Sequence, residues 1–243
     1  MLRVLLSSVL FACAASPVCT RPPAPQSATP APAQAPSPAP PPVSRRVSGL
    51  TLTSDAEPRV RIKFAKEFKY AGGHSFVLYD VANAEQHFFV DADARGRVRR
   101  LYWVQFEGYL PTNTRSYNYK SPNVVKVGAL DFVADSQARR IPPPDPAAAA
   151  KPANKISDGE QARAFLASKG YTLASDEALW QRLVHLTDAS KRSELMVIYL
   201  EDLGGTGMTA ADLNEGGRAA AQWESVSKAL LERARAGMTI ERR

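Results

Sequence analysis

A proline-rich segment near the start of the chain confines any compact fold to the residues that follow it. Between residues 17 and 42 lie 11 of the chain's 19 prolines, mixed with small and polar residues, and Arg21 is the only charge among them. This composition has too little apolar surface to offset the entropy lost on ordering. We therefore expect a disordered tether over residues 16–44. Its proline-rich residues 17–42 alone would reach roughly 80 Å at about 3.1 Å per residue.

A short apolar leader precedes this tether. Arg3 gives a positive start, residues 4–12 form an apolar run, and small residues follow as far as Ala15. This order is typical of a secretory signal peptide, and the apolar run is shorter than the about 20 residues that a bilayer span needs. We predict a signal peptide over residues 1–15 and export to the periplasm or cell envelope. A buried N-terminal strand is the alternative.

Both cysteines, Cys13 and Cys19, lie at this end of the chain, so the folded part contains no disulfide. The tetrapeptide that ends at Cys13, Leu-Phe-Ala-Cys, resembles the bacterial lipobox, in which a small residue precedes a cysteine that becomes lipid-modified. The resemblance implies lipidation of Cys13, which would hold the protein at a membrane surface. Ordinary signal-peptide cleavage is the alternative.

The remaining residues, 45–243, are numerous enough for one domain with a substantial core. They include all 24 acidic residues and 29 of the 31 basic ones, so their formal net charge is +5. Because acidic and basic residues are interspersed along the chain, the charge pattern favours a solvated surface over a nucleic-acid interface. Binding to an anionic polymer or lipid headgroup is a further alternative. It requires four arginines to cluster, namely Arg97, Arg99, Arg139 and Arg140.

The first half of this domain has the pattern of short strands separated by tight turns, with apolar side chains alternating with polar ones. Tight turns cannot make parallel crossovers, so the sheet should be antiparallel. The strands that we expect cover residues 59–64, 75–81, 86–90, 97–106 and 123–133.

The second half begins with a helical pattern. Ser157 and Glu160 have the spacing of a capping box, and Gly170 stands where a helix commonly ends. These signals predict a helix over residues 158–169. A second amphipathic pattern predicts a helix over residues 218–236.

Between these helices, residues 179–186 and 195–203 read as a β-hairpin. An isolated hairpin is not stable in water, so it should join the first sheet. The predicted fold class is therefore α+β: an antiparallel sheet of about five to seven strands with two helices packed on one face. The proline- and alanine-rich residues 141–154 form an excursion from this domain, and two separate small domains are the alternative.

Motifs that would carry chemistry are few. Residues 91–96 resemble the start of a calcium loop but lack its later ligands, and the glycines of residues 203–207 lack the continuation of a phosphate loop. The three histidines, His74, His87 and His185, have none of the spacings typical of metal sites. The folded part also has no cysteine and no GxSxG nucleophile motif. We expect no metal and no cofactor.

One loop has the composition of a binding surface. Residues 107–120 place three tyrosines beside amide and guanidinium groups, which suit recognition of sugars, peptides or carboxylates. The alternative is that the tyrosines fix the loop to the sheet. The expected ligand-binding residues are Tyr109, Asn113, Arg115, Tyr117 and Tyr119.

These patterns favour an exported, noncatalytic binding or scaffold module, displayed on its tether in the cell envelope. We expect its partner to be an envelope protein, a peptide or a glycan, and contact with the membrane only through a lipid anchor; nucleic acid is not expected. The alternative is an exported hydrolase. It would use Asp80 or Glu107 together with His74 or His185.

Overall fold

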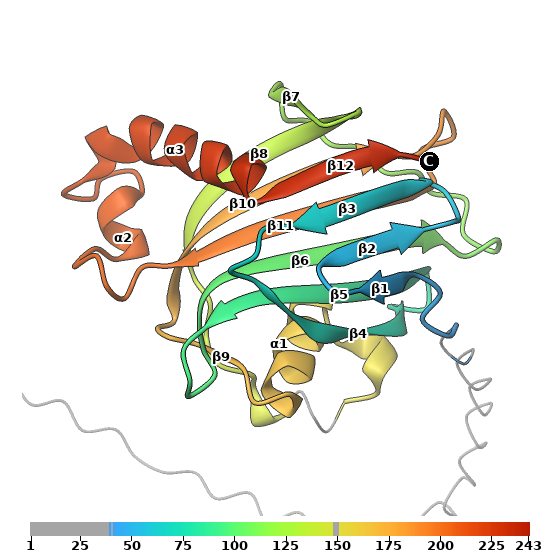
Figure 1. Cartoon of the computed structure of the whole chain (residues 1–243), viewed down its shortest axis with the longest axis horizontal. Coiled ribbons are helices and arrows are strands. Elements are labelled where there is room, and N and C mark those ends of the chain that lie inside the picture. The colour runs from blue at the N-terminus through green and yellow to red at the C-terminus, as the bar shows by residue number, and fades with distance from the viewer. Residues whose placement is uncertain (1–38, 40, 148–150) are drawn as a thin grey trace, which may run out of the picture. The chain divides into compact units, whose positions relative to one another are not determined.

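A large antiparallel sheet is the centre of the fold (Figure 1). The structure is a computed structural model that describes residues 39, 41–147 and 151–243, so the predicted signal peptide, Cys13 and most of the predicted tether lie outside the described residues. The strand order is β4-β5-β6-β11-β10-β8-β7, and the short β9 pairs in parallel with β6. The strands are β4 (Lys69–Leu78), β5 (Ala82–Ala92), β6 (Arg97–Tyr109), β7 (Val124–Val127), β8 (Leu130–Arg140), β9 (Thr172–Leu173), β10 (Glu177–Leu186) and β11 (Ser193–Asp202).

The expected hairpin of the second half is β10 and β11, and it lies inside the large sheet, between β8 and β6. The prediction that it joins the first sheet is confirmed. The middle strands are buried on both faces: every residue from Ala84 to Asp91 and from Glu194 to Leu200 is buried. Such continuous burial means that each face of the sheet must be covered by another layer.

One face is covered by a second, smaller sheet and by helix α3 (Figure 1). The smaller sheet has the order β1-β2-β3-β12 and is antiparallel throughout. Its strands are β1 (Arg46–Ser48), β2 (Thr51–Ser54), β3 (Val60–Phe64) and β12 (Met238–Arg242), and α3 spans Trp223–Ala236. Ile62 and Met238 of this layer pack with Phe89 and Leu183 of the large sheet in one buried cluster.

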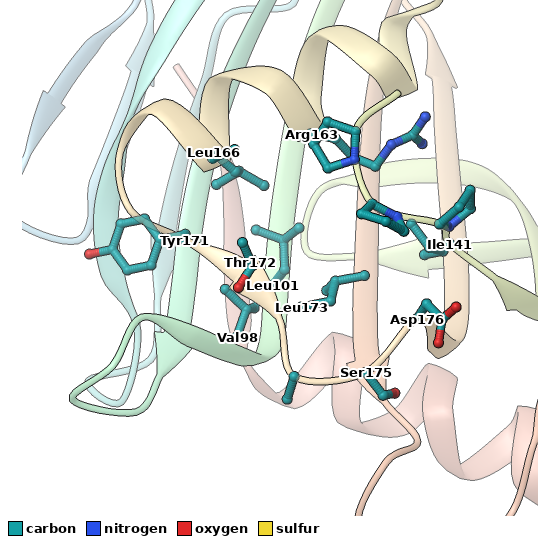
Figure 2. A pocket seen from close by; sticks show the side chains of 15 residues that line it. Val98, Leu101, Ile141, Arg163, Leu166, Tyr171, Thr172, Leu173, Ser175 and Asp176 are labelled. Atoms are coloured by element: carbon teal, nitrogen blue, oxygen red, sulfur yellow. The ribbon is translucent and has the colours of Figure 1, made fainter. Parts of the chain in front are cut away.

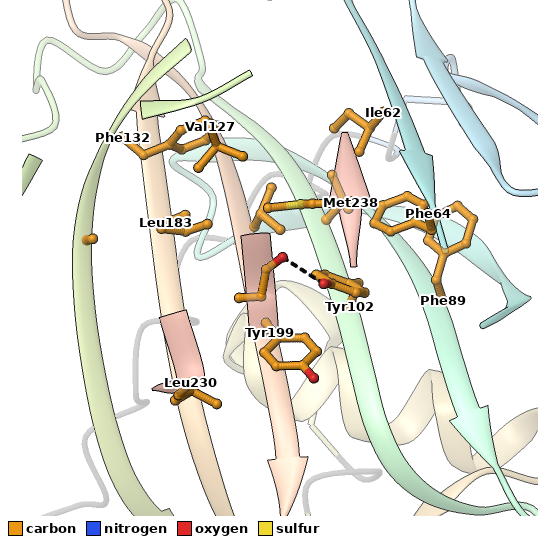
Figure 3. Packing of buried hydrophobic residues seen from close by; sticks show 14 of the residues in the cluster. Ile62, Phe64, Phe89, Tyr102, Val127, Phe132, Leu183, Tyr199, Leu230 and Met238 are labelled. Atoms are coloured by element: carbon orange, nitrogen blue, oxygen red, sulfur yellow. Dashed lines mark hydrogen bonds between the residues drawn. The ribbon is translucent and has the colours of Figure 1, made fainter. Parts of the chain in front are cut away.

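Tyr102 of β6 joins the large sheet to α3 (Figure 3). Its side chain is fully buried, its ring packs beside Phe64 and Tyr199, and its hydroxyl donates a 2.7 Å hydrogen bond to the main-chain oxygen of Ala234. Gly237 directly follows the last residue of α3, and a Cβ there would stand 2.3 Å from the Tyr102 hydroxyl oxygen. Glycine at this position therefore lets the chain pass close over Tyr102 as it turns from α3 into β12.

The opposite face carries helix α1 (Asp158–Ser168) and a second buried cluster (Figure 1). The predicted capping box is confirmed, because the Ser157 hydroxyl accepts a hydrogen bond from the Glu160 amide and the Glu160 carboxylate accepts one from the Ser157 amide. The remaining helical turns are η2 (Ala153–Lys155), α2 (Ala210–Leu213) and η3 (Ala220–Gln222). Among the described residues, no helix is both long and apolar enough to cross a bilayer.

The α+β class with an antiparallel sheet is confirmed, but the predicted numbers and arrangement are wrong. The described residues form 12 strands in two sheets, and the two longer helices cover opposite faces of the large sheet. The expected strand 123–133 is two strands joined by a turn at Gly128, and the expected helix 218–236 begins as η3. The short strands β1, β2 and β12 have too few alternating residues to be recognised in the sequence.

Replacing Tyr102 with phenylalanine tests the junction between β6 and α3. Tyr102→Phe removes the only polar atom of a buried ring and leaves the Ala234 carbonyl without this donor, so we expect the free energy of unfolding to fall by about 1–2 kcal/mol. Urea denaturation measures this change. Tyr171→Phe, at a partly exposed ring, is the control and should cost less than about 0.5 kcal/mol; equal effects of the two variants would contradict the assigned role.

Candidate ligand-binding cavity

An apolar cavity lies between α1 and the large sheet (Figure 2). Its volume is about 290 Å³, close to the lower end of the range for small-molecule sites, about 300–1,000 Å³. We call it the apolar hollow. Its walls come from β6, from α1, from the turn around β9 and from the start of the proline-rich residues 141–147. The main lining side chains are Val98, Leu101, Ile141, Pro142, Pro143, Pro144, Leu166, Tyr171 and Leu173.

Main-chain hydrogen bonds hold the rim of this hollow. The Thr172 amide donates to the Gly96 oxygen at 3.1 Å, and the Ile141 amide donates to the Asp176 oxygen at 2.6 Å. Gly96 has a φ of +76°, and a Cβ there would stand 2.1 Å from the Gly170 oxygen. Only glycine therefore lets the β5–β6 turn approach the end of α1 this closely. The residues predicted as an excursion, 141–154, thus begin as one wall of the cavity.

A second cavity of about 390 Å³ adjoins the first and shares Leu101, Ile141, Arg163, Leu166 and Leu173 with it. We call it the wider hollow. Two indole rings form part of its wall, Trp103 and Trp180, packed edge to face with centroids 5.9 Å apart. Its charged lining residues are Asp135, Arg139, Asp158, Arg163 and Arg182.

The charges of the wider hollow are only partly matched with one another. Arg182 pairs with Asp135 at 2.8 Å, and the Arg139 guanidinium lies 4.8 Å from the centre of the Trp180 ring. Burial raises the pKa of Asp158, against the opposing effect of nearby hydrogen bonds and arginines. Two buried atoms, Arg163 Nε and Asp135 Oδ1, have no hydrogen-bond partner among the described residues. Both belong to residues that line this hollow, so its polar groups are not saturated by the protein.

The length of α1 explains why the cavity exists. Its 11 residues extend for about 16 Å, whereas the seven strands in a row span about 29 Å at a spacing of roughly 4.8 Å. One short helix cannot cover an apolar face of that width. Its buried apolar residues, Ala162 and Leu166, belong to the buried cluster on this face and line the wider hollow.

Beyond the N-terminus of α1 the same face becomes polar. The Gln86 amide nitrogen donates to Gln105 Oε1 at 2.8 Å, and the Gln105 amide nitrogen donates to Glu107 Oε2 at 2.6 Å. His74 Nε2 lies 2.8 Å from Gln86 Oε1, and Gln86 also donates to the Asp158 main-chain oxygen at 3.1 Å. This row of hydrogen bonds joins β4, β5 and β6 to the start of α1.

Glu107 and Glu194 end this row as a direct cross-strand pair of β6 and β11. Two carboxyl groups in this register repel each other when ionised. The Tyr117 hydroxyl donates to Glu107 at 2.7 Å, and the Tyr119 hydroxyl donates to Glu194 at 2.6 Å. Burial raises the pKa of Glu107 and raises that of Glu194 to about 8, and the Tyr119 bond and Arg182 oppose the shift at Glu194. Glu194 is therefore largely protonated at neutral pH.

The predicted binding loop supplies these tyrosines. Tyr117 is buried, Tyr119 is partly buried, and Tyr109 stacks on Tyr117 with ring centroids 4.4 Å apart. Arg115 is exposed, and Asn113 is partly exposed and accepts a hydrogen bond from the Arg115 amide. The hydroxyls of Tyr117 and Tyr119 thus fix the loop to the sheet through two carboxyl groups. The prediction that this loop binds a ligand stays a prediction.

The residues of the predicted hydrolase have other hydrogen-bond partners. His74 bonds to the side-chain amide of Gln86, and His185 Nδ1 lies 2.9 Å from the main-chain oxygen of Asp131. Asp80 accepts hydrogen bonds from Asn154 and Lys155. Burial lowers the pKa of His74, with a smaller opposing effect from Gln86.

Most of the arginines expected to cluster on an anionic surface are paired. Arg97 pairs with Asp93 at 2.9 Å, Arg99 with Asp91 at 2.7 Å and Arg140 with Asp176 at 2.6 Å. Arg139 instead lies over Trp180 in the wider hollow. Three of these four charges are therefore matched by a carboxylate. Binding to an anionic polymer stays a prediction, and these ion pairs count against it.

The other face holds a buried polar group that the sequence did not reveal. Glu85 Oε1 lies 2.8 Å from His87 Nε2, and the Tyr70 hydroxyl lies 3.0 Å from His87 Nδ1. Glu85 also accepts hydrogen bonds from the main-chain amides of Ser44 and Arg45. Burial alone would raise the pKa of Glu85, but these hydrogen bonds together hold it well below its usual range. This carboxylate holds the chain at Ser44 and Arg45, directly before β1, and three residues upstream the Pro41 main-chain oxygen accepts a hydrogen bond from the Ser75 hydroxyl.

Most of the residues that line the two hollows had no recognisable signal in the sequence, and Arg139 was singled out only as part of an arginine cluster with Arg97, Arg99 and Arg140. Asp135 and Arg163 stand on separate elements, β8 and α1, and neither belongs to a motif. The capping box located α1, but the side of the sheet that α1 covers depends on pairings distant in sequence. Searches of family models, curated proteins and solved structures found nothing that matches this chain.

Glu194 makes the stability of the protein depend on pH. Its pKa is about 8 in the folded state against a reference of 4.5, so the folded state binds the proton more tightly than the unfolded state does. This stabilisation is complete below about pH 4.5 and is lost as the pH rises to about 8. Glu194→Gln should abolish this pH-dependent loss of stability. At pH 8 we expect the variant to be about 1–3 kcal/mol more stable than the wild-type chain, with little difference at pH 5.

Urea denaturation at both pH values measures this difference. The control is Glu232→Gln, on the exposed side of α3, which should leave the pH dependence unchanged. The same loss of stability between pH 5 and pH 8 in wild type and Glu194→Gln would contradict a raised pKa at this position.

Proposed function

We propose that this protein is an exported, noncatalytic binding module of the cell envelope whose ligand occupies the apolar hollow. The observation that carries the proposal is the cavity of about 290 Å³ with a nearly continuous apolar lining, joined to a wider hollow with charged groups. Concave, mostly apolar sites with a few polar groups are the usual form of small-molecule sites. Export and display on a tether come from the sequence patterns described above.

The distribution of polar groups supports binding over catalysis. The hydrolase alternative depends on a histidine beside a carboxylate, and His74 and His185 bond to an amide and a main-chain carbonyl. His87 does contact Glu85, but its other ring nitrogen is occupied by Tyr70, and its side chain is fully buried. The residues of the apolar hollow offer contact area for a ligand and little chemistry.

An apolar ligand for the hollow differs from the sugar, peptide or carboxylate that the composition of the tyrosine loop suggested. Two of the three tyrosine hydroxyls in that loop bond to the buried carboxyl groups of Glu107 and Glu194. A loop held in this way has fewer groups to offer a sugar or peptide. The loop is therefore a second candidate surface, and the cavity under α1 is the first.

A tryptophan placed in the hollow tests the proposal. Ala164 and Ala167 are both exposed residues of α1, and of these two it is Ala167 that lines the apolar hollow. We expect the full chain to bind the neutral apolar dye 1-N-phenylnaphthylamine with a rise in fluorescence. Ala167→Trp should weaken binding about tenfold because the indole occupies the same space.

Ala164→Trp is the matched control, since it adds the same side chain to the same helix outside the cavity. It should bind the dye as wild type does. Failure of the wild-type chain to bind the dye, or equal affinity of wild type and Ala167→Trp, would overturn the proposed site. Circular dichroism spectra would establish that both variants are folded.

A further inference from the structure

The two hollows differ in character, and the difference defines the ligand that fits both. The apolar hollow is lined mostly by aliphatic, proline and aromatic side chains, with Arg163 at the boundary that it shares with the wider hollow (Figure 2). Its other polar lining residues are Thr172, Ser175 and Asp176, and the Asp176 carboxylate is paired with Arg140. A sugar or a peptide would lose hydrogen bonds to water there without replacing them. A hydrocarbon chain loses none, and each buried methylene contributes about 0.8 kcal/mol.

The size of the apolar hollow limits the ligand to one chain. A volume of about 290 Å³ lies at the lower end of small-molecule sites, so one extended acyl or alkyl chain fills it. The proline-rich residues 142–144 form one wall, and the Leu166 side chain forms another.

The charges at the boundary favour an anion. Three arginines and two aspartates line the wider hollow, and one aspartate, Asp135, is already paired with Arg182. Among the described residues, neither Arg139 nor Arg163 has a carboxylate within ion-pair distance, and Arg163 Nε is buried without a hydrogen-bond partner. Guanidinium groups bind carboxylates and phosphates with paired, charge-assisted hydrogen bonds.

We infer that the ligand is a single-chain anion, with its chain in the apolar hollow and its carboxylate or phosphate head at Arg163 in the wider hollow. This inference rests on the proposed function and adds the class of ligand to it. Arg163 lines both hollows, so a head held there leaves the chain free to enter the apolar one. Arg139 of β8 and Trp180 of β10 also line the wider hollow, with the Arg139 guanidinium over the indole ring.

Displacement of 1-N-phenylnaphthylamine from the full chain tests the head and the chain separately. Four competitors share one chain length: myristate, myristoyl lysophosphatidate, uncharged monomyristoylglycerol and cationic myristyltrimethylammonium. We expect at least one of the two anions to displace the dye at about tenfold lower concentration than the uncharged and cationic competitors. Whichever of the two anions displaces the dye at the lower concentration identifies the head group as a carboxylate or a phosphate.

Variants at Arg163 locate the head. Arg163→Gln should remove the preference for the anions over the uncharged competitor of the same chain length, and Arg163→Lys should retain part of this preference because it keeps the charge. Arg97→Gln is the control, since Arg97 pairs with Asp93 and lines neither hollow. An anion preference that persists in Arg163→Gln would overturn the assignment of the head.

The outcomes separate this inference from the proposed function. Dye binding that Ala167→Trp weakens, together with equal displacement by all four competitors, would overturn the anionic head and leave the binding site intact. Dye binding without displacement by any competitor would overturn the single-chain ligand. Absence of dye binding would overturn both the ligand class and the proposed site.

Discussion

A sheet that is apolar on both faces requires two covers, and most of this structure follows from that requirement. The middle strands β5, β6, β10 and β11 carry large buried side chains on each side, so neither face tolerates water. The first face is covered by a second sheet and α3, fixed through the buried hydroxyl of Tyr102. Residues from opposite ends of the domain, β1 to β3 and β12, meet in that cover, so the layer forms only when the whole domain has folded.

The second cover is incomplete. Helix α1 is shorter than the sheet is wide, and the rest of this face is covered by the start of the proline-rich residues 141–147, the turn around β9 and a row of hydrogen-bonded polar side chains. Where α1 and the polar row do not reach, the apolar and the wider hollow remain. A fold optimised only for stability would fill such space, because each unfilled methyl-sized void costs about 1 kcal/mol.

The sequence predicted those features that depend on neighbouring residues. The capping box of Ser157 and Glu160 located α1, and alternation located most long strands of the large sheet. Strands of three to five residues were missed because they contain too few alternations, and the face occupied by each helix depends on pairings between distant strands. The cavity had no signature, since Asp135 and Arg163 come together only through the sheet and the helix that lies over it. Of the expected loop 107–120, the first three residues, Glu107 to Tyr109, belong to β6, and the inward direction of the Tyr117 and Tyr119 hydroxyls depends on Glu107 and Glu194 standing opposite each other.

If the preceding residues form the proposed tether, Glu85 is one of the groups that a pull on that tether would load. Its carboxylate holds the main-chain amides of Ser44 and Arg45 and pairs with the Arg45 guanidinium at 3.0 Å, at the point where the chain enters the fold. A pull on the preceding segment reaches this carboxylate before it reaches the short edge strand β1. Because Glu85 belongs to β5, inside the large sheet, the force passes into the best-connected part of the molecule. Under the proposed display on a tether, these contacts would oppose unravelling of the domain strand by strand from its N-terminal side.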